Sequence, residues 1–177
     1  MKKILFLFSI SLLLISCKDD SANAEDKDVL VKSTTPVTLP YTAAYSSDWT
    51  DEVSDQVLLT VLNSYKNWET GDMTKLAETL ADSVIFLSWD GFKFSGTKGE
   101  LMDRWSKSRD SLSSVQITVD AWRKSHSSDK NADFIGIWYK EITTNKNGKV
   151  DSAYYQDDNL VKDGKIVWYS QHKQFLK

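Results

Sequence analysis

The spacing of apolar residues changes along residues 48–177, and this change constrains the fold more than any other feature of the sequence. Three stretches repeat apolar residues every three or four positions, which is typical of amphipathic helices. Later stretches either alternate apolar with polar residues or are apolar at both odd and even positions. Both patterns are typical of strands. The order is helix, helix, hairpin, helix and then four antiparallel strands. The sequence therefore predicts an α+β domain.

Residues that favour helix ends bound the three predicted helices. Gly71 can cap the end of the first helix, and Asp72 can cap the start of a second, short one. Thr97 and Glu100 have the spacing of a capping box at the start of the third. The three apolar stripes comprise Val53, Val57, Val61, Tyr65 and Trp68, then Met73, Leu76, Ala77 and Leu80, then Leu101, Met102, Trp105 and Leu112.

Pairs that end in glycine mark the predicted hairpin turns. Asp90-Gly91 is expected to form a tight turn with both residues at positive φ, and Asn147-Gly148 and Asp163-Gly164 are expected to turn the later strands. A polar loop is predicted over 125–131. The predicted strands are 84–89, 92–94, 115–122, 134–142, 150–161 and 166–175.

The first residues resemble the leader of a bacterial lipoprotein. Lys2 and Lys3 precede an apolar run, residues 4–15, that is too short to span a bilayer as a helix. Leu14-Ile15-Ser16-Cys17 matches a lipobox, in which Cys17 is lipidated and becomes the first mature residue. An ordinary signal peptide or an uncleaved anchor are the alternatives. A lone Cys in an exported chain can form no internal disulfide, whereas acyl chains on Cys17 would give a stable membrane anchor.

The leader and the composition that follows it predict three segments. These are a signal peptide in 1–16, the lipidated Cys with a flexible tether in 17–47, and a folded domain in 48–177. The tether is rich in Ser, Thr, Asp and Lys and holds both prolines. Lys18-Asp19-Asp20 resembles the surface-export signal of Bacteroidota lipoproteins. We expect a lipid-anchored protein of the bacterial cell envelope, in the outer membrane, with surface and periplasmic orientations both open.

Over roughly residues 50–177 the chain resembles the nuclear transport factor 2-like (NTF2-like) superfamily, with its cystatin-like fold, and SnoaL-like members in particular. The motifs that carry the resemblance are Trp68-Glu69-Thr70-Gly71-Asp72, Ala81-Asp82-Ser83-Val84 and Lys162-Asp163-Gly164-Lys165-Ile166. The resemblance implies a strongly curved antiparallel sheet wrapped over three helices, with a pocket at the open end of this cone. The superfamily includes isomerases, dehydratases, cyclases, epoxide hydrolases and binding modules, so the fold leaves the function open.

Asp157 is the candidate inward carboxylate. Many members of the superfamily carry a His shortly before the closing Asp-Gly-Lys, where this chain has Gln156. Asp157 and Asp158 are consecutive in a predicted strand, so one must face each side of the sheet. Comparison with the ketosteroid isomerase branch favours Asp157 as the inward residue. Desolvation among Trp side chains would raise its pKa towards neutrality.

The register of the terminal hairpin is left open between two alternatives. With a two-residue loop, Asp157 lies opposite Ser170, and Trp168 and His172 are its diagonal neighbours. With a three-residue loop, Asp157 faces Tyr169. The candidate catalytic residues are therefore Asp157 with Tyr169 or His172. The simpler interpretation is that the paired aspartates are solvated or paired with nearby lysines, and that His172 lies at the surface or on an edge strand.

Aromatic residues, including seven Trp, are the candidate walls of a pocket, although core packing is the simpler role for most of them. The candidate ligand-binding residues are Tyr65, Trp68, Trp89, Trp105, Trp138, Gln156 and Trp168. Two separated His and one Cys give no pattern of a metal site, and there is no phosphate-binding loop or nucleophile elbow. We therefore expect no metal, no cofactor and, without a basic patch, no nucleic-acid partner.

Two classes of function remain. The favoured one is a binding module for a small apolar or aromatic molecule, or an accessory subunit, held at the membrane through Cys17. The alternative is a cofactor-free isomerase, dehydratase or hydrolase in which Asp157 moves a proton. The resemblance also implies a possible homodimer through the outer face of the sheet, with Trp122 as a candidate exposed anchor.

Overall fold

The computed structural model describes residues 38–175. The chain divides into two units, Met1–Leu39 and Pro40–Lys177, and all the described helices and strands belong to the second. The predicted leader and Cys17 lie outside the described residues.

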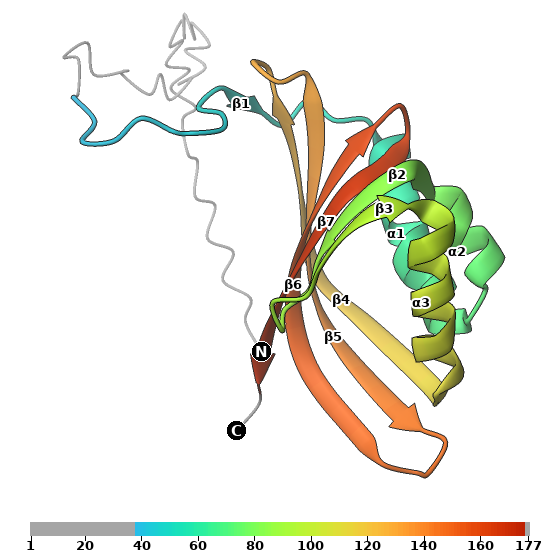
Figure 1. The fold of residues 1–177 in the computed structure, drawn as a ribbon. Coiled ribbons are helices and arrows are strands. Elements are labelled where there is room, and N and C mark those ends of the chain that lie inside the picture. Colours follow the sequence, from blue (N-terminus) through green and yellow to red (C-terminus); the bar gives the residue numbers. More distant parts are fainter. Residues whose placement is uncertain (1–37, 176–177) are drawn as a thin grey trace, which may run out of the picture. The chain divides into compact units, whose positions relative to one another are not determined.

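Seven strands form one curved sheet in the order β1-β4-β5-β6-β7-β2-β3 (Figure 1). All neighbouring strands are antiparallel except β2 and β7, which are parallel. The predicted α+β architecture is confirmed, and the sheet does not close into a barrel. The strands are β1 (Trp49–Thr50), β2 (Leu80–Leu87), β3 (Lys93–Thr97), β4 (Leu112–Ser127), β5 (Ala132–Asn145), β6 (Val150–Lys162) and β7 (Lys165–Phe175).

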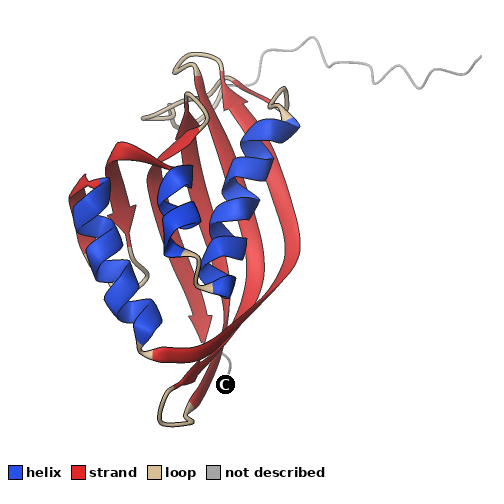
Figure 2. Cartoon of the chain, turned by 90° about the vertical axis from the view of Figure 1, so that its right-hand side faces the viewer, coloured by secondary structure: helices blue, strands red, loops and turns tan. Residues whose placement is uncertain are grey.

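Three helices, α1 (Asp55–Thr70), α2 (Met73–Thr79) and α3 (Lys98–Asp110), cover one face of the sheet (Figure 2). Their predicted caps are confirmed. Gly71 ends α1 at φ 78°, and the Asp72 carboxylate accepts a hydrogen bond from the backbone N–H of Lys75 at the start of α2. Thr97 and Glu100 form the reciprocal bonds of a capping box. Local sequence therefore sets where each helix begins or ends.

The hydrophobic core lies between the helices and the sheet. Val61 of α1, Leu101 of α3, and Ile135 and Ile137 of β5 are completely buried. Because side chains alternate along a strand, this burial identifies the face of β5 that carries Ile135, Ile137 and Tyr139 as the helix-covered face. We call it the inner face, and we call the opposite side of the sheet the outer face.

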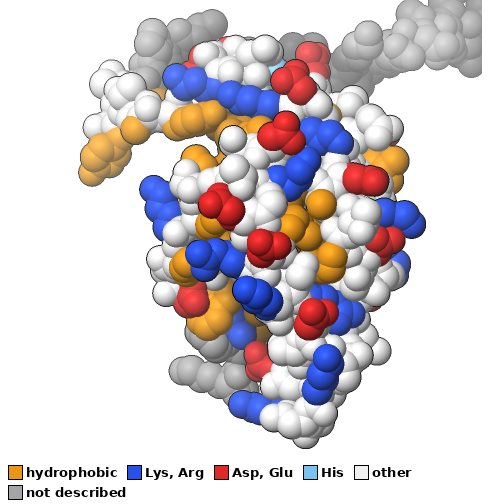
Figure 3. Space-filling model, turned by 45° about the vertical axis from the view of Figure 1, so that its right-hand side comes forward, with side chains coloured by type: hydrophobic (Ala, Val, Ile, Leu, Met, Phe, Trp, Pro, Cys, Tyr) orange, Lys and Arg blue, Asp and Glu red, His pale blue; other side chains and the backbone are white. Residues whose placement is uncertain are grey.

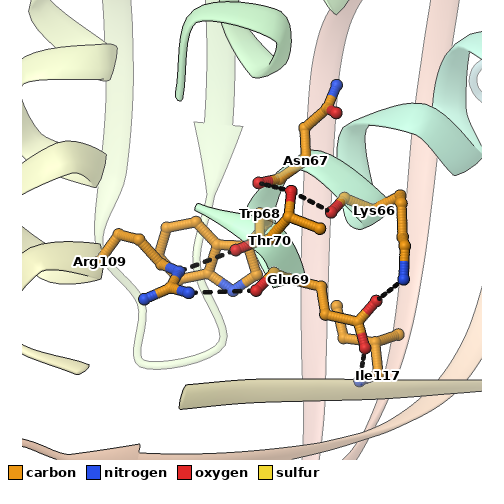
Figure 4. A network of polar contacts seen from close by, with 7 residues as sticks. All are labelled: Lys66, Asn67, Trp68, Glu69, Thr70, Arg109 and Ile117. Carbon is orange, nitrogen blue, oxygen red and sulfur yellow. Dashed lines mark hydrogen bonds and ion pairs between the residues drawn. The ribbon is translucent and has the colours of Figure 1, made fainter. Parts of the chain in front are cut away.

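Polar contacts hold the C-terminal end of α1 against α3 and β4 (Figure 4). The Arg109 guanidinium donates to the backbone carbonyls of Trp68 (2.9 Å) and Glu69 (3.1 Å). The Glu69 carboxylate accepts from the Lys66 ammonium (2.6 Å) and from the backbone N–H of Ile117 (3.1 Å). The hydrogen bonds of Arg109 satisfy carbonyls that a helix end otherwise leaves without partners. Together with the hydrogen bond from Ile117 of β4 to Glu69, they fix α1, and with it Tyr65, relative to the sheet.

The turn at Asp90-Gly91 differs from the prediction. Only Gly91 has positive φ (86°), and the backbone N–H of Ser88 donates to the carbonyl of Phe92 (2.8 Å). The loop therefore has three residues, with Trp89 in the turn instead of the strand. Gly91 alone takes the left-handed conformation that such a loop requires.

Strand β4 is longer than predicted and contains a β-bulge. It begins at Leu112, which was assigned to the third helix, and it continues through the predicted loop as far as Ser127. Val119 pairs with Tyr139 but Ala121 pairs with Trp138, so one extra residue lies in β4 at this point. A bulge of this kind exchanges the faces of all residues beyond it.

The terminal hairpin has the predicted tight turn but a different register. Asp163 (φ 50°) and Gly164 (φ 71°) form a two-residue turn between β6 and β7. A register shift follows, because Val161 pairs with Ile166 but Leu160 pairs with Trp168. As a result Asp157 pairs with Gln171, and neither of the two registers considered from the sequence is correct.

Candidate functional site

Asp157 lies on the inner face of β6 and is completely buried. Its Oδ2 atom accepts hydrogen bonds from the hydroxyls of Tyr169 (2.6 Å) and Tyr65 (2.8 Å). Its Oδ1 atom is also buried and has no partner among the described residues. One oxygen of the carboxyl thus accepts two hydrogen bonds, and the other accepts none.

Two amide side chains orient the tyrosine hydroxyls. Asn159 donates to the hydroxyl of Tyr65 (3.3 Å) and to a backbone carbonyl of β5 (3.2 Å). Gln171 donates to the hydroxyls of Tyr169 (3.0 Å) and Tyr139 (3.1 Å). Because a hydroxyl that accepts from an amide still has its own proton to donate, Tyr65 and Tyr169 can both donate to the carboxylate. The network therefore stabilises the charged or shared-proton form of the acid.

Burial raises the pKa of Asp157 to about 7, although the hydrogen bonds from Tyr169 and Tyr65 oppose this rise by stabilising the carboxylate. Burial and the nearby Asp157 charge raise the pKa of Tyr65 and of Tyr169 well above the usual value, so both remain hydroxyl donors. A carboxyl that titrates near neutrality can both accept and donate a proton. The inner site therefore has the electrostatic properties of a proton carrier.

Asp158 faces the opposite side of the sheet, where the structure has a cavity of about 620 Å³. We call this the outer cavity. Its aromatic lining residues are Tyr45, Trp49, Phe134, Trp138 and Trp168, and its polar ones are Arg123, Ser125, Gln156 and Asp158. Gly136 and Leu160 complete the lining. Tyr45 precedes β1, in a segment that the sequence analysis assigned to the tether.

The predicted ligand-binding residues separate into groups. Trp138, Gln156 and Trp168 come together in the outer cavity. Trp68 and Trp105 pack against the hydrophobic core, and the indole N–H of Trp68 donates to the Glu141 carboxylate (3.0 Å). The other two residues lie elsewhere.

Tyr65 belongs to the inner site, and Trp89 is exposed in the β2–β3 turn, where the Lys173 ammonium lies 4.8 Å from the centre of its ring. Of the candidate catalytic residues, Tyr169 contacts Asp157, but His172 does not. His172 pairs with Gln156 on the outer face, because the register shift in β7 moves Tyr169 to the inner face instead. Trp122 is exposed, but it pairs with Ile137 on the inner face of β4.

Sequence reasoning missed Asn159, Gln171 and Tyr139 at the inner site, and Arg123 and Gly136 in the outer cavity. Strict alternation from Asp157 predicts that Asn159 shares its face, so that signal was available. Gln171 and Arg123 reach their positions only because of the two bulges, which no local pattern marks.

No group of three or more His, Cys, Asp or Glu side chains able to hold a metal ion occurs among residues 38–175. Within the same part of the chain, no helix is long and apolar enough to cross a membrane. On the face seen in Figure 3, basic and acidic side chains are interspersed, without a field of one sign.

No family model and no curated protein matches this chain in sequence. Solved structures do match it in fold. A ketosteroid isomerase-like protein from Erwinia carotovora atroseptica has a TM-score of 0.58 and 15% identity, covering 72% of this chain and 100% of that one. An NTF2-like family protein from Streptomyces avermitilis, proposed to be a dehydratase, has a TM-score of 0.58 and 15% identity, with coverages of 69% and 97%.

An epoxide hydrolase from Mycobacterium tuberculosis, of the LEH-like kind, has a TM-score of 0.57 and 9% identity, with coverages of 68% and 84%. At these identities the likeness concerns the fold and not the activity. Three helices on one face of a curved, mostly antiparallel sheet, together with these neighbours, show that the folded unit has an NTF2-like fold.

Proposed function

We propose that this chain is a lipid-anchored protein of the bacterial cell envelope whose NTF2-like domain binds a small, flat, mainly apolar molecule. The observation that carries the proposal is the outer cavity. Its volume of about 620 Å³ falls within the usual range for small-molecule sites, roughly 300–1,000 Å³. Membrane anchoring rests on the lipobox at Cys17.

The aromatic rings around the outer cavity support binding of a flat ligand. The Phe134 ring is 5.3 Å from the ring of Trp49, 5.8 Å from that of Tyr45 and 6.5 Å from that of Trp168, measured between centroids. Trp138 lines the cavity from the other side of Gly136 along β5. Aromatic walls bury large apolar areas and stack on flat ligands, with few rotatable bonds to immobilise.

A screen of small aromatic compounds tests this function. The full chain with Cys17→Ser, which cannot be acylated at this position, would be titrated while intrinsic Trp fluorescence and thermal stability are followed. We expect compounds that bind the unmodified chain to lose at least tenfold in affinity for Trp138→Ala and Trp168→Ala. Trp89→Ala is the matched control, because Trp89 does not line the cavity. The proposal would be refuted if no compound in the screen binds, or if the compounds that bind have the same affinity for all three variants as for the unmodified chain.

The anchor needs a separate test. Cells that express the chain would be fed a labelled fatty acid, and the membrane fraction would be analysed. Label that is incorporated into the chain and lost in Cys17→Ser supports the anchor, whereas unlabelled chain in the soluble fraction contradicts it.

Proton transfer at Asp157 is a second candidate function. The bare Oδ1 atom favours it, because this oxygen can take a proton from a substrate while Tyr65 and Tyr169 stabilise the carboxylate at Oδ2. Fold neighbours that include an epoxide hydrolase and an isomerase-like protein agree with such chemistry. Tyr169, which donates to the acid, is only partly buried.

Isomerisation and hydration substrates would test the second candidate. Loss of a detected activity in Asp157→Asn, with retention in Asp158→Asn, supports it, and the rate should rise through pH 7 if the carboxylate acts as the base. An activity that survives Asp157→Asn would exclude this role.

A further inference from the structure

We propose that the outer cavity selects ligands that carry a cationic group at one end of a flat ring and an anionic group at the other. This inference deepens the proposed binding function and rests on it. It comes from one row of residues across the sheet, Arg123, Gly136 and Asp158, which we call the charged row.

The charged row places opposite charges on either side of a glycine. Arg123 of β4 pairs with Gly136 of β5, and Gly136 pairs with Asp158 of β6, so all three lie side by side on the outer face. Neighbouring strands are about 4.8 Å apart, which separates the Cα atoms of the two charged residues by roughly 10 Å. Among residues 38–175 no salt bridge joins them to each other or to other side chains. Both charges are thus available to a ligand.

Gly136 is at this position for space and not for backbone conformation. Its φ is not positive, unlike that of the turn glycines, so any residue could adopt its conformation. A Cβ atom at this position would lie 3.4 Å and 3.5 Å from two ring atoms of Trp138, and 3.5 Å from Oδ1 of Asp158. These are ordinary van der Waals distances, so the missing side chain leaves space beside the Trp138 ring and the carboxylate. A glycine inside a strand often marks a site where a ligand approaches the backbone closely.

Aromatic rings bound the same position along the strand. Phe134 and Trp138 are two residues before and after Gly136, so their side chains share its face. The position is therefore enclosed by two rings along β5 and by two opposite charges across the sheet. A ring held between the aromatic walls would direct a cation to Asp158 and the Trp138 face, and an anion to the Arg123 guanidinium.

A second copy of the chain is the competing occupant of this face, since a two-fold interface could bring Arg123 of one copy to Asp158 of the other. The concave shape favours the small molecule. Tyr45 and Trp49, which lead into and form the edge strand β1, line the cavity together with residues of four neighbouring strands. A partner sheet would have to displace these rings to reach the charged row.

The probes are 4-(aminomethyl)benzoate, which has an ammonium and a carboxylate at opposite ends of one ring, and its single-charge counterparts benzylamine and benzoate. Each would be titrated calorimetrically into the full chain with Cys17→Ser. We expect 4-(aminomethyl)benzoate to bind at least tenfold more tightly than either counterpart. Asp158→Asn should remove this advantage over benzoate without changing the affinity for benzoate. Arg123→Gln should remove only the advantage over benzylamine.

Asp103→Asn and Lys107→Gln make the same charge changes on exposed positions of α3, on the other side of the sheet, and should leave all three affinities unchanged. Gly136→Ala should weaken all three probes together, because it narrows the cavity without removing a charge. Sedimentation of the same variants at several concentrations identifies the competing occupant.

Equal binding of the three probes would overturn the charge selection while leaving the proposed function intact, because the cavity would then still bind rings. Absence of binding by these probes, when neutral aromatic compounds from the screen do bind, would have the same meaning. A dimer that dissociates in both Arg123→Gln and Asp158→Asn would assign the charged row to a second copy and overturn the inference.

Discussion

Asp157 and Asp158 are neighbours in one strand, yet the structure gives them opposite environments. Asp157 is completely buried and accepts two tyrosine hydroxyls. Asp158 lines an open cavity among aromatic rings, and Arg123 lies in the same row across the sheet, separated from it by a glycine. The face of the sheet, and not the residue type, decides whether a carboxyl is buried among hydroxyl donors or lines an open cavity.

The two regions also differ in how they use space. At the inner site the side chains surround a completely buried carboxyl, and its polar atoms are satisfied by one another except at Oδ1 of Asp157. The outer cavity is empty at the position where Gly136 omits a side chain. We therefore expect changes at the inner site to act on stability and its pH dependence, and changes in the outer cavity to act on binding.

The largest expected effect concerns the pH dependence of stability. The pKa of Asp157 is about 7 in the folded chain and about 3.9 in an unfolded one, so the folded state binds more protons between these values. The stabilisation is therefore fully present below pH 4 and is lost as the pH rises to 7. The free energy of unfolding should fall by up to about 4 kcal/mol across this interval.

Chemical unfolding at several pH values measures this change. Asp157→Asn should remove most of it and leave only the smaller contribution of Glu141, whose pKa burial also raises, whereas Asp158→Asn should retain it. An equal pH dependence in both variants would show that the comparison between the two faces is wrong.

Removal of one hydroxyl donor gives an intermediate effect. Tyr169→Phe or Tyr65→Phe leaves the Asp157 carboxylate with a single tyrosine donor, and a hydrogen bond to a charged group contributes about 1.5–3 kcal/mol. Each substitution should raise the pKa of Asp157 by about one unit or more, so that stability continues to fall above pH 7. Unfolding between pH 6 and 9 reports the shift. Tyr154→Phe, on the outer face, serves as the control and should leave the profile unchanged.

The smallest effect is expected at Gly136. Gly136→Ala should raise the free energy of unfolding by about 0.5–1 kcal/mol, because alanine loses less backbone entropy and its Cβ meets ordinary contacts. The same change at Gly148, at φ 83°, should instead lower it by about 1 kcal/mol. Thermal unfolding compares the two variants. Destabilisation by Gly136→Ala would mean that the position does not have the spare room that ligand binding requires.

Much of the fold follows from local sequence, but only part of the site does. Helix caps at Gly71, Asp72 and Thr97 are determined by residues a few positions apart, and the structure has each of them as predicted. The prediction for the Asp90-Gly91 turn was wrong by one residue in length, because Trp89 belongs to the turn and only Gly91 adopts positive φ. Short-range signals therefore show that a turn is present more reliably than they show how many residues it contains.

The sequence by itself determined that Asp157 and Asp158 face opposite sides and that Asp163-Gly164 reverses the chain, because alternation and positive φ are local properties. Only the tertiary structure decided which side chains meet them. One bulge in β7 brings Tyr169 to Asp157, and another in β4 puts Arg123 on the face of Asp158. Bulges bend a strand and increase its local twist, and where they are needed depends on how the whole sheet curves over three helices, so no short stretch of sequence contains the information that places them.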